Sequence, residues 1–139
     1  MYSIDETAMR ILATLEEAGE DDAVDLINTV NATSGAPGEL KQFVMALEQL
    51  IRGGLVRMST DKEKSGTLRP LSVDESLTAL EAISSYTQYD SKASAWFDTR
   101  RTAPPYSGRF PYVLTTDVGL PIAQELLKTR GWQWWKRRI

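Results

Sequence analysis

The sequence contains neither cysteine nor histidine among its 139 residues. Without cysteine the chain forms no disulfide and offers no thiolate ligand to a metal. Without histidine it has no imidazole ligand for zinc and no histidine base for a serine or cysteine nucleophile. A carboxylate-only hydrolase or magnesium site stays open in principle, but no constellation of catalytic groups points to one. We therefore expect no enzyme activity, no cofactor and no metal.

Long apolar runs are also missing. The uninterrupted apolar stretches are only a few residues long, too short for a membrane-spanning helix. The first ten residues lack a basic start followed by an apolar run, so we expect no secretory signal and a cytoplasmic protein. The apolar fraction of 42% and the charged fraction of 25% are typical of a globular protein. The length favours a single domain over residues 1–139.

The chain has a small net charge, but its acidic and basic residues are unevenly distributed along the sequence. The net charge of −3 argues mildly against a nucleic-acid ligand. Residues 1–38 hold eight acids and one base, whereas residues 100–139 hold eight bases and two acids. Such asymmetry can steer a polyanion to one face or pair the ends of neighbouring subunits. The plainer alternative is that solvated faces of opposite sign happen to be separate.

Three helices are predicted before residue 59. Apolar residues at intervals of three and four indicate a helix over about 5–18 and a second one, capped by Asp21 or Asp22, that ends near residue 30. The longest amphipathic stretch, residues 39–52, follows a turn-rich segment and ends at a pair of glycines. Two short helices before a longer one are typical of a helix-turn-helix core.

Strands are expected on both sides of a large insertion. The run Leu55–Met58 reads as a short strand, and residues 109–115 read as a second. Between them, residues 59–70 are polar and read as a loop, and residues 88–108 have no clear period and also read as a loop.

Two further helices are predicted in the second half of the chain. Ser72 and Glu75 form a capping-box pattern that opens a helix to about residue 86. The final helix is expected from about residue 120 to about residue 129, with Pro121 in its first turn and Gly131 as its stop or kink.

Two segments resemble the winged-helix transcription regulators, in the broad MarR-like and PadR-like sense. The segment LEQLIRGGLVRM, Leu47–Met58, is similar to the end of the recognition helix and the first wing strand. The segment YVLTTDVGLPIAQELL, Tyr112–Leu127, is similar to the second wing strand and the start of the next helix, with Thr116 and Gly119 at its "T..G" positions.

The resemblance implies a fold and a mode of action. It implies an α+β, mostly α, winged helix-turn-helix fold, with a three-helix core and first wing strand over residues 1–58. Residues 59–109 are then a helix-containing insertion between the two wing strands, and residues 110–139 hold the second strand, the final helix and a basic aromatic tail. It further implies operator binding by paired recognition helices and dimerisation through terminal helices. The insertion departs from the short hairpin of that family, and it is a candidate for a ligand pocket or a partner surface.

The outward residues of the third helix are the candidate base readers. In a major groove they would meet base edges: Glu39, Lys41, Gln42, Met45, Ala46 and Gln49. Lys41 suits guanine or phosphate, and Gln42 or Gln49 suits adenine in a bidentate pair. Arg52 and Arg57 would reach phosphates, which position a protein without reading sequence. An ordinary amphipathic helix with a solvated outer face is the alternative.

Basic and aromatic residues outside this helix allow several interpretations. Arg100, Arg101 and Arg109 flank a Pro-Pro-Tyr turn and suit a basic wing tip that grips DNA, or else they are solvated loop arginines. The cluster of Tyr86, Tyr89, Trp96 and Phe97 would line a small-molecule pocket or tie the insertion to the body.

The tail carries Trp132, Trp134 and Trp135, followed by Lys136-Arg137-Arg138. These residues suit stacking on single-stranded nucleic acid, a membrane interface, or packing on the core or across a dimer seam, which we favour because tryptophan buries a large apolar area.

The sequence therefore predicts a homodimeric winged-helix regulator that binds double-stranded DNA with the helix at about 39–52. The alternative is a winged-helix module that binds a protein partner without binding DNA. The overall acidity, the glutamates on the third helix and the size of the insertion favour that alternative. Neither hypothesis places the chain in a membrane.

Overall fold

A computed structural model describes residues 5–18, 20–30, 35–59, 69–99 and 111–134. Residues 18, 20–22, 25 and 131–134 lie within these ranges, in helices or strands, but only their backbone is described. Within these ranges, none of the helices has the length and apolar character needed to cross a membrane.

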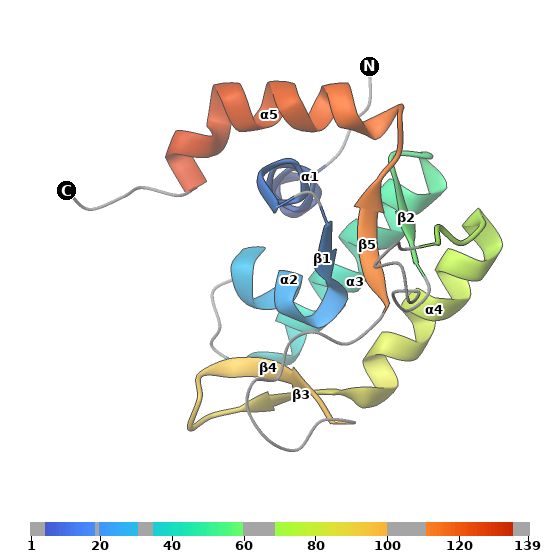
Figure 1. The fold of residues 1–139 in the computed structure, drawn as a ribbon. Helices are drawn as coiled ribbons and strands as arrows, with labels where there is room; N and C mark the ends of the chain where they lie inside the picture. The colour runs from blue at the N-terminus through green and yellow to red at the C-terminus, as the bar shows by residue number, and fades with distance from the viewer. Residues whose placement is uncertain (1–4, 19, 31–34, 60–68, 100–110, 135–139) are drawn as a thin grey trace.

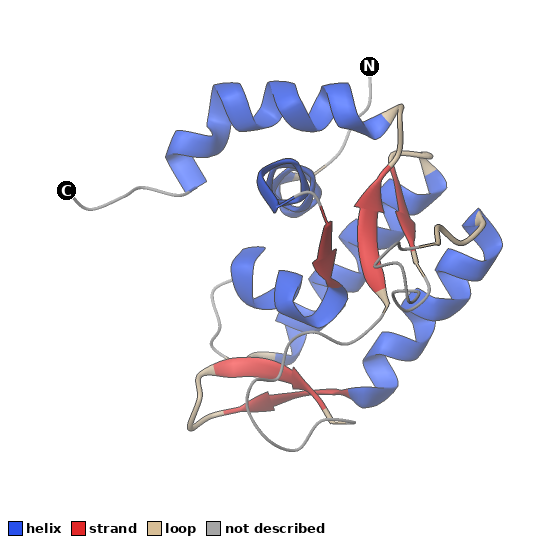
Figure 2. Cartoon of the chain, in the orientation of Figure 1, coloured by secondary structure: helices blue, strands red, loops and turns tan. Residues whose placement is uncertain are grey.

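The elements follow one another in an order that mixes helices and short strands (Figure 1). They are α1 (Glu6–Ala18), β1 (Glu20–Asp22), α2 (Ala23–Val30), α3 (Pro37–Arg52), β2 (Val56–Met58), α4 (Val73–Tyr86), β3 (Thr87–Asp90), β4 (Ala95–Asp98), β5 (Tyr112–Thr115) and α5 (Gly119–Trp134). Helices account for most of the regular structure, and the strands form two small antiparallel sheets (Figure 2). The α+β, mostly helical class expected from the sequence is therefore confirmed.

The larger sheet brings together strands that lie far apart in the sequence. Its order is β1-β5-β2, and β5 pairs antiparallel with both neighbours. Val113 of β5 lies opposite Asp21 on one side and Met58 on the other. The strand β1 was not predicted, because its sequence Glu-Asp-Asp has no strand-forming residue and was interpreted as a helix cap. Pairing with β5 decides its conformation.

The second sheet corrects the first part of the prediction of a loop over residues 88–108, whereas residues 100–108 lie outside the described residues. Strands β3 and β4 form a hairpin in which Gln88 lies opposite Phe97 and Tyr89 opposite Trp96. At its turn the Asp90 carboxylate accepts a hydrogen bond from the Lys92 amide at 2.9 Å. Each strand has only four residues, too few for a clear alternating pattern, so the period of two was not recognised.

The core lies where α1, α2 and α3 meet the larger sheet. Phe43, Leu47 and Leu50 line the inner face of α3, as their spacing predicts, and all are fully buried. The helix α5 lies across α1, and Ala123 is its fully buried residue in the core cluster (Figure 1). The helix α4 packs along α3 on another side of the molecule, so α3 is covered both by the core and by the insertion.

The helix α5 is longer than predicted. It begins at Gly119, with Pro121 in the first turn as expected, but it continues to Trp134 through Gly131. The prediction that Gly131 stops the helix was therefore wrong. A glycine inside a helix costs only about 1 kcal/mol relative to alanine, which neighbouring residues can offset.

The junction between β5 and α5 joins the two segments that carry the family resemblance. The Thr116 hydroxyl donates to the Gly54 carbonyl at 2.6 Å, and the Thr116 amide donates to the Leu55 carbonyl at 3.0 Å. The same hydroxyl accepts the Gly119 amide at 3.0 Å, which satisfies a free donor at the start of α5. A side chain on Gly119 would collide with the backbone of Leu55. The residues of the "GL" pattern, Gly54 and Leu55, therefore contact those of the "T..G" pattern, Thr116 and Gly119.

Residues 71–76, at and before the start of α4, cover the outer edge of β2. The Met58 amide donates to the hydroxyl of Ser76 on α4 at 3.0 Å, and the Met58 carbonyl accepts the Leu71 amide at 2.9 Å. Ser76 is completely buried there. An uncovered edge strand offers free backbone groups to other chains, so these two bonds protect the edge as well as docking α4.

The start of α4 has the capping box that the sequence predicts. The Ser72 hydroxyl accepts the Glu75 amide at 3.1 Å, and the Glu75 carboxylate accepts the Ser72 amide at 3.1 Å. The hydrogen bonds from the Ser72 backbone and side chain lower the pKa of the Glu75 carboxyl below its ordinary value. The charged carboxylate is thus favoured in the folded state.

This cap makes the stability of α4 depend on pH. Because the folded pKa of Glu75 lies below its unfolded value, its contribution is complete above the ordinary glutamate value of about 4.3 and disappears as the pH falls through the folded pKa. We expect Glu75→Gln to remove this part of the pH dependence of the free energy of unfolding. Urea titrations from neutral to acidic pH measure it. Ser72→Ala should remove only a smaller share, because alanine keeps the backbone amide that makes the larger contribution. An unchanged pH profile in Glu75→Gln would contradict the assignment.

Candidate functional site

The outer face of α3 is a continuous exposed stripe. Successive helical residues are separated by about 100°, so positions three and four apart share a face. The stripe consists of Lys41, Gln42, Met45, Gln49 and Arg52, all exposed. Met45, at its centre, is 60% exposed, the largest value among the exposed large apolar side chains of the described residues. Four of the predicted site residues therefore do lie together.

Two residues predicted to face outward belong elsewhere. The Glu39 carboxylate accepts the Gly35 amide at 2.9 Å and the Trp96 indole N–H at 3.2 Å, so it anchors the start of α3. Ala46 is buried, because it lies three residues after Phe43 and four before Leu50 on the inner face. Neither is available to a base edge. The error at Glu39 arose because a partner from the distant β4 cannot be read from the helix period.

The charge of the stripe is positive but small. Lys41 and Arg52 are its cations, and Glu48 borders it. The Arg52 guanidinium lies 3.7 Å from the Glu48 carboxylate, with both side chains more than half exposed, at 63% and 51%. Such an exposed pair is worth little in water. A phosphate would therefore compete readily with Glu48 for Arg52.

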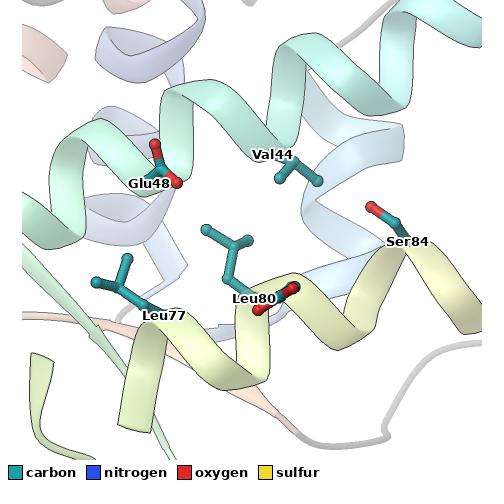
Figure 3. Close-up of a pocket in the computed structure, with 6 residues that line it drawn as sticks. Val44, Glu48, Leu77, Leu80 and Ser84 are labelled. Carbon is teal, nitrogen blue, oxygen red and sulfur yellow. The ribbon is translucent and has the colours of Figure 1, made fainter. Parts of the chain in front are cut away.

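An open groove of about 410 Å³ runs beside this stripe, between α3 and α4 (Figure 3). Val44, Leu77 and Leu80 form its apolar part, and Figure 3 places Val44 and Glu48 on α3 opposite Leu77, Leu80 and Ser84 on α4. The other lining residue is Glu81. Two carboxylates thus border an apolar floor, and no basic residue is among the six that line the groove.

No protein-family model matches the chain, and no curated protein or solved structure matches it significantly.

The aromatic cluster of the insertion ties the hairpin to the body. The side-chain amide of Asn28 on α2 donates to the Trp96 carbonyl at 2.9 Å and accepts the Trp96 amide at 2.7 Å. The Trp96 ring is buried and meets Tyr89 edge to face, with ring centroids 5.5 Å apart. These contacts match the anchoring interpretation of the cluster, which was the alternative to a small-molecule pocket.

The remaining predicted residues are not assembled into the stripe. Arg57 lies on β2, half-buried, and its guanidinium donates to the neighbouring Val56 carbonyl at 3.4 Å. Arg100, Arg101, Arg109 and Trp135 lie outside the described residues, as do the side chains of Trp132 and Trp134. Within the described part of the chain, no three acidic residues come close enough together to hold a metal ion.

Two residues that organise this region were missed by sequence reasoning. In the sequence, Asn28 is a polar residue after Leu26-Ile27 and shortly before a turn-rich segment. A solvated residue at the end of a helix has the same pattern. Ser76 looked like an ordinary position in the first turns of α4. Both bond to backbone groups of strands more than 17 residues away in sequence, and no local pattern records such partners.

Proposed function

We propose that this chain is a winged-helix DNA-binding protein, a transcription regulator that reads duplex DNA with α3. The order α1-β1-α2-α3-β2, closed by β5 and followed by α5, supports the proposal, as does the antiparallel β1-β5-β2 sheet. The contacts of Thr116 and Gly119 with Leu55 add support, because they join the two segments that resemble the winged-helix regulators.

The observation that carries the proposal is the exposed stripe on α3. Its side chains have the chemistry for major-groove recognition: Lys41 can bind guanine or phosphate, and Gln42 and Gln49 can pair with adenine edges. Arg52, at the end of the helix, suits a backbone phosphate. Met45 at the centre offers an apolar contact of the kind that thymine methyl groups receive.

A regulator of this kind is expected to act as a homodimer. A two-fold dimer presents two α3 helices to the two halves of a palindromic site, which doubles the number of contacts. The small positive charge of a single stripe makes this doubling important, because phosphate contacts supply most of the non-specific affinity.

The second candidate function is a protein-interaction module. The groove between α3 and α4 favours it, because an apolar floor bordered by Glu48 and Glu81 suits a basic and apolar partner and repels phosphate. The two functions predict opposite outcomes for one experiment, namely titration of the purified chain with duplex DNA at low salt.

Neutralising the cations of the stripe tests the proposal. We expect Lys41→Gln and Arg52→Gln each to weaken binding to a labelled duplex of random sequence, because each removes about one phosphate contact. Fluorescence anisotropy from about 50 to about 200 mM salt measures the slope of log affinity against log salt, which should become shallower by about 0.9 for each variant.

Lys128→Gln is the matched control. It removes the same charge from the exposed surface of α5, away from the stripe, and should leave the salt slope unchanged. An equal loss in all three variants would indicate net charge alone and contradict the assignment to α3. If the chain binds no duplex even at the lowest salt concentration, the DNA-binding proposal is contradicted and the interaction module is favoured.

A further inference from the structure

The groove between α3 and α4 has a composition that specifies its occupant. Val44, Leu77 and Leu80 offer an apolar floor, which is favourable for burying an aromatic or aliphatic side chain. The exposed carboxylates of Glu48 and Glu81 come from the two facing helices. An occupant should therefore combine large apolar side chains with adjacent positive charge.

The chain's own C-terminal tail, residues 132–139, has this composition. Its sequence is WQWWKRRI, with three tryptophans followed directly by Lys136, Arg137 and Arg138. Tryptophan buries a large apolar area on contact, and the three bases complement the two glutamates of the groove. The tail thus has both parts of the required chemistry within eight residues.

The position of α5 indicates which copy supplies the tail. The helix lies across α1, and its last residues are at the end of the molecule away from α4 (Figure 1). Trp135 and the three bases follow Trp134 directly, so they can reach at most about 14 Å from the end of α5. They leave from a helix end that lies away from the groove, so the groove of the same copy is poorly placed to receive them.

We propose that the groove between α3 and α4 binds the C-terminal tail of a second copy of this chain. A tryptophan of the tail packs on Val44, Leu77 and Leu80, and the bases lie beside Glu48 and Glu81. Reciprocal exchange of two tails closes a two-fold dimer, the commonest symmetry of homo-oligomers. Because Glu48 also borders the stripe on α3, the tail of the partner copy would add positive charge next to that stripe. The proposal does not depend on DNA binding.

Charge reversal on both sides of the contact tests the proposal. Sedimentation equilibrium of the full-length chain measures the dimer dissociation constant. Glu48→Lys combined with Glu81→Lys should raise that constant at least about tenfold, because like charges then face each other. Arg137→Glu combined with Arg138→Glu should raise it similarly. A chain that carries all four changes should recover most of the lost affinity, since the signs of the charges are exchanged.

The control pair is Glu17→Lys with Glu125→Lys, which places the same charge change on the exposed surfaces of α1 and α5. It should leave the dissociation constant unchanged. Circular dichroism of each variant verifies that the helices are retained, so that a loss of association is not a loss of fold.

Four outcomes would overturn the proposal. A chain that stays monomeric at every concentration has no such contact. A dimer insensitive to both reversals, or sensitive only to the control pair, associates through another surface such as the terminal helices. A dimer that depends on the tail but not on Glu48 and Glu81 places the tail elsewhere. If the chain with all four changes does not recover affinity, the bases of the tail do not pair with Glu48 and Glu81. None of these measurements includes DNA, so they leave the recognition of DNA by α3 untouched, although a chain that is always monomeric would also contradict the homodimer expected under the proposed function.

Discussion

Replacing Gly119 with alanine is expected to lower the free energy of unfolding by about 3 kcal/mol. A Cβ on this residue would lie 2.8 Å from the Leu55 carbonyl carbon and closer still to its oxygen, far inside contact distance. The obstacle is backbone and therefore cannot rotate away. Leu55 also accepts the Thr116 amide at 3.0 Å, so a shift of Leu55 would disrupt the link between β2 and α5. Urea denaturation followed by circular dichroism measures the change as a shift of the midpoint.

Gly38→Ala is the matched control for this prediction. Gly38 lies in the first turn of α3, and a Cβ there would meet nothing within 4 Å. Alanine is the better helix former by up to about 1 kcal/mol, so this variant should be as stable as the parent or slightly more stable. A loss at Gly119 no greater than the change at Gly38 would show that the junction is looser than described.

Asn28→Asp is expected to lower the free energy of unfolding by about 3 kcal/mol. The substitution conserves shape, but it replaces the amide donor that lies 2.9 Å from the Trp96 carbonyl with a carboxylate oxygen. Two acceptors then face each other in a partly buried site, and a negative charge is desolvated as well. The bond from the Trp96 amide to Asn28 remains, so the effect reports the lost donor and the added charge but not the loss of this second bond. The free energy of unfolding at neutral pH provides the measurement.

Gln88→Glu makes the same chemical change on the exposed face of the neighbouring strand β3. It should alter the free energy of unfolding by no more than about 0.5 kcal/mol. If Asn28→Asp is equally mild, the hairpin is not held by this amide.

This anchor also bears on the proposed DNA-reading helix. The Trp96 ring donates to Glu39 in the first turn of α3, and Asn28 on α2 holds the Trp96 backbone. The hairpin of the insertion therefore connects α2 to the start of α3. In the proposed function the start of α3 enters the major groove, so a displaced hairpin would misplace Lys41 and Gln42 relative to base edges.

The positions of most helices were predictable from sequence because their signals are local. The buried spacing of Phe43, Leu47 and Leu50 repeats within one helix, and Ser72 with Glu75 marks the start of α4 within four residues. The same spacing correctly placed Lys41, Gln42, Gln49 and Arg52 on the outer face of α3.

By itself, the sequence determined the helix-forming segments, the outward face of α3 and the chemistry of the tail. Only the tertiary structure decided that Glu-Asp-Asp is a strand, that Glu39 faces Trp96 and that α3 and α4 enclose a groove. The physical reason is the same in each case. Helix period and caps depend on residues a few positions apart, whereas strand pairing, buried hydrogen bonds and grooves depend on partners brought together from distant parts of the chain.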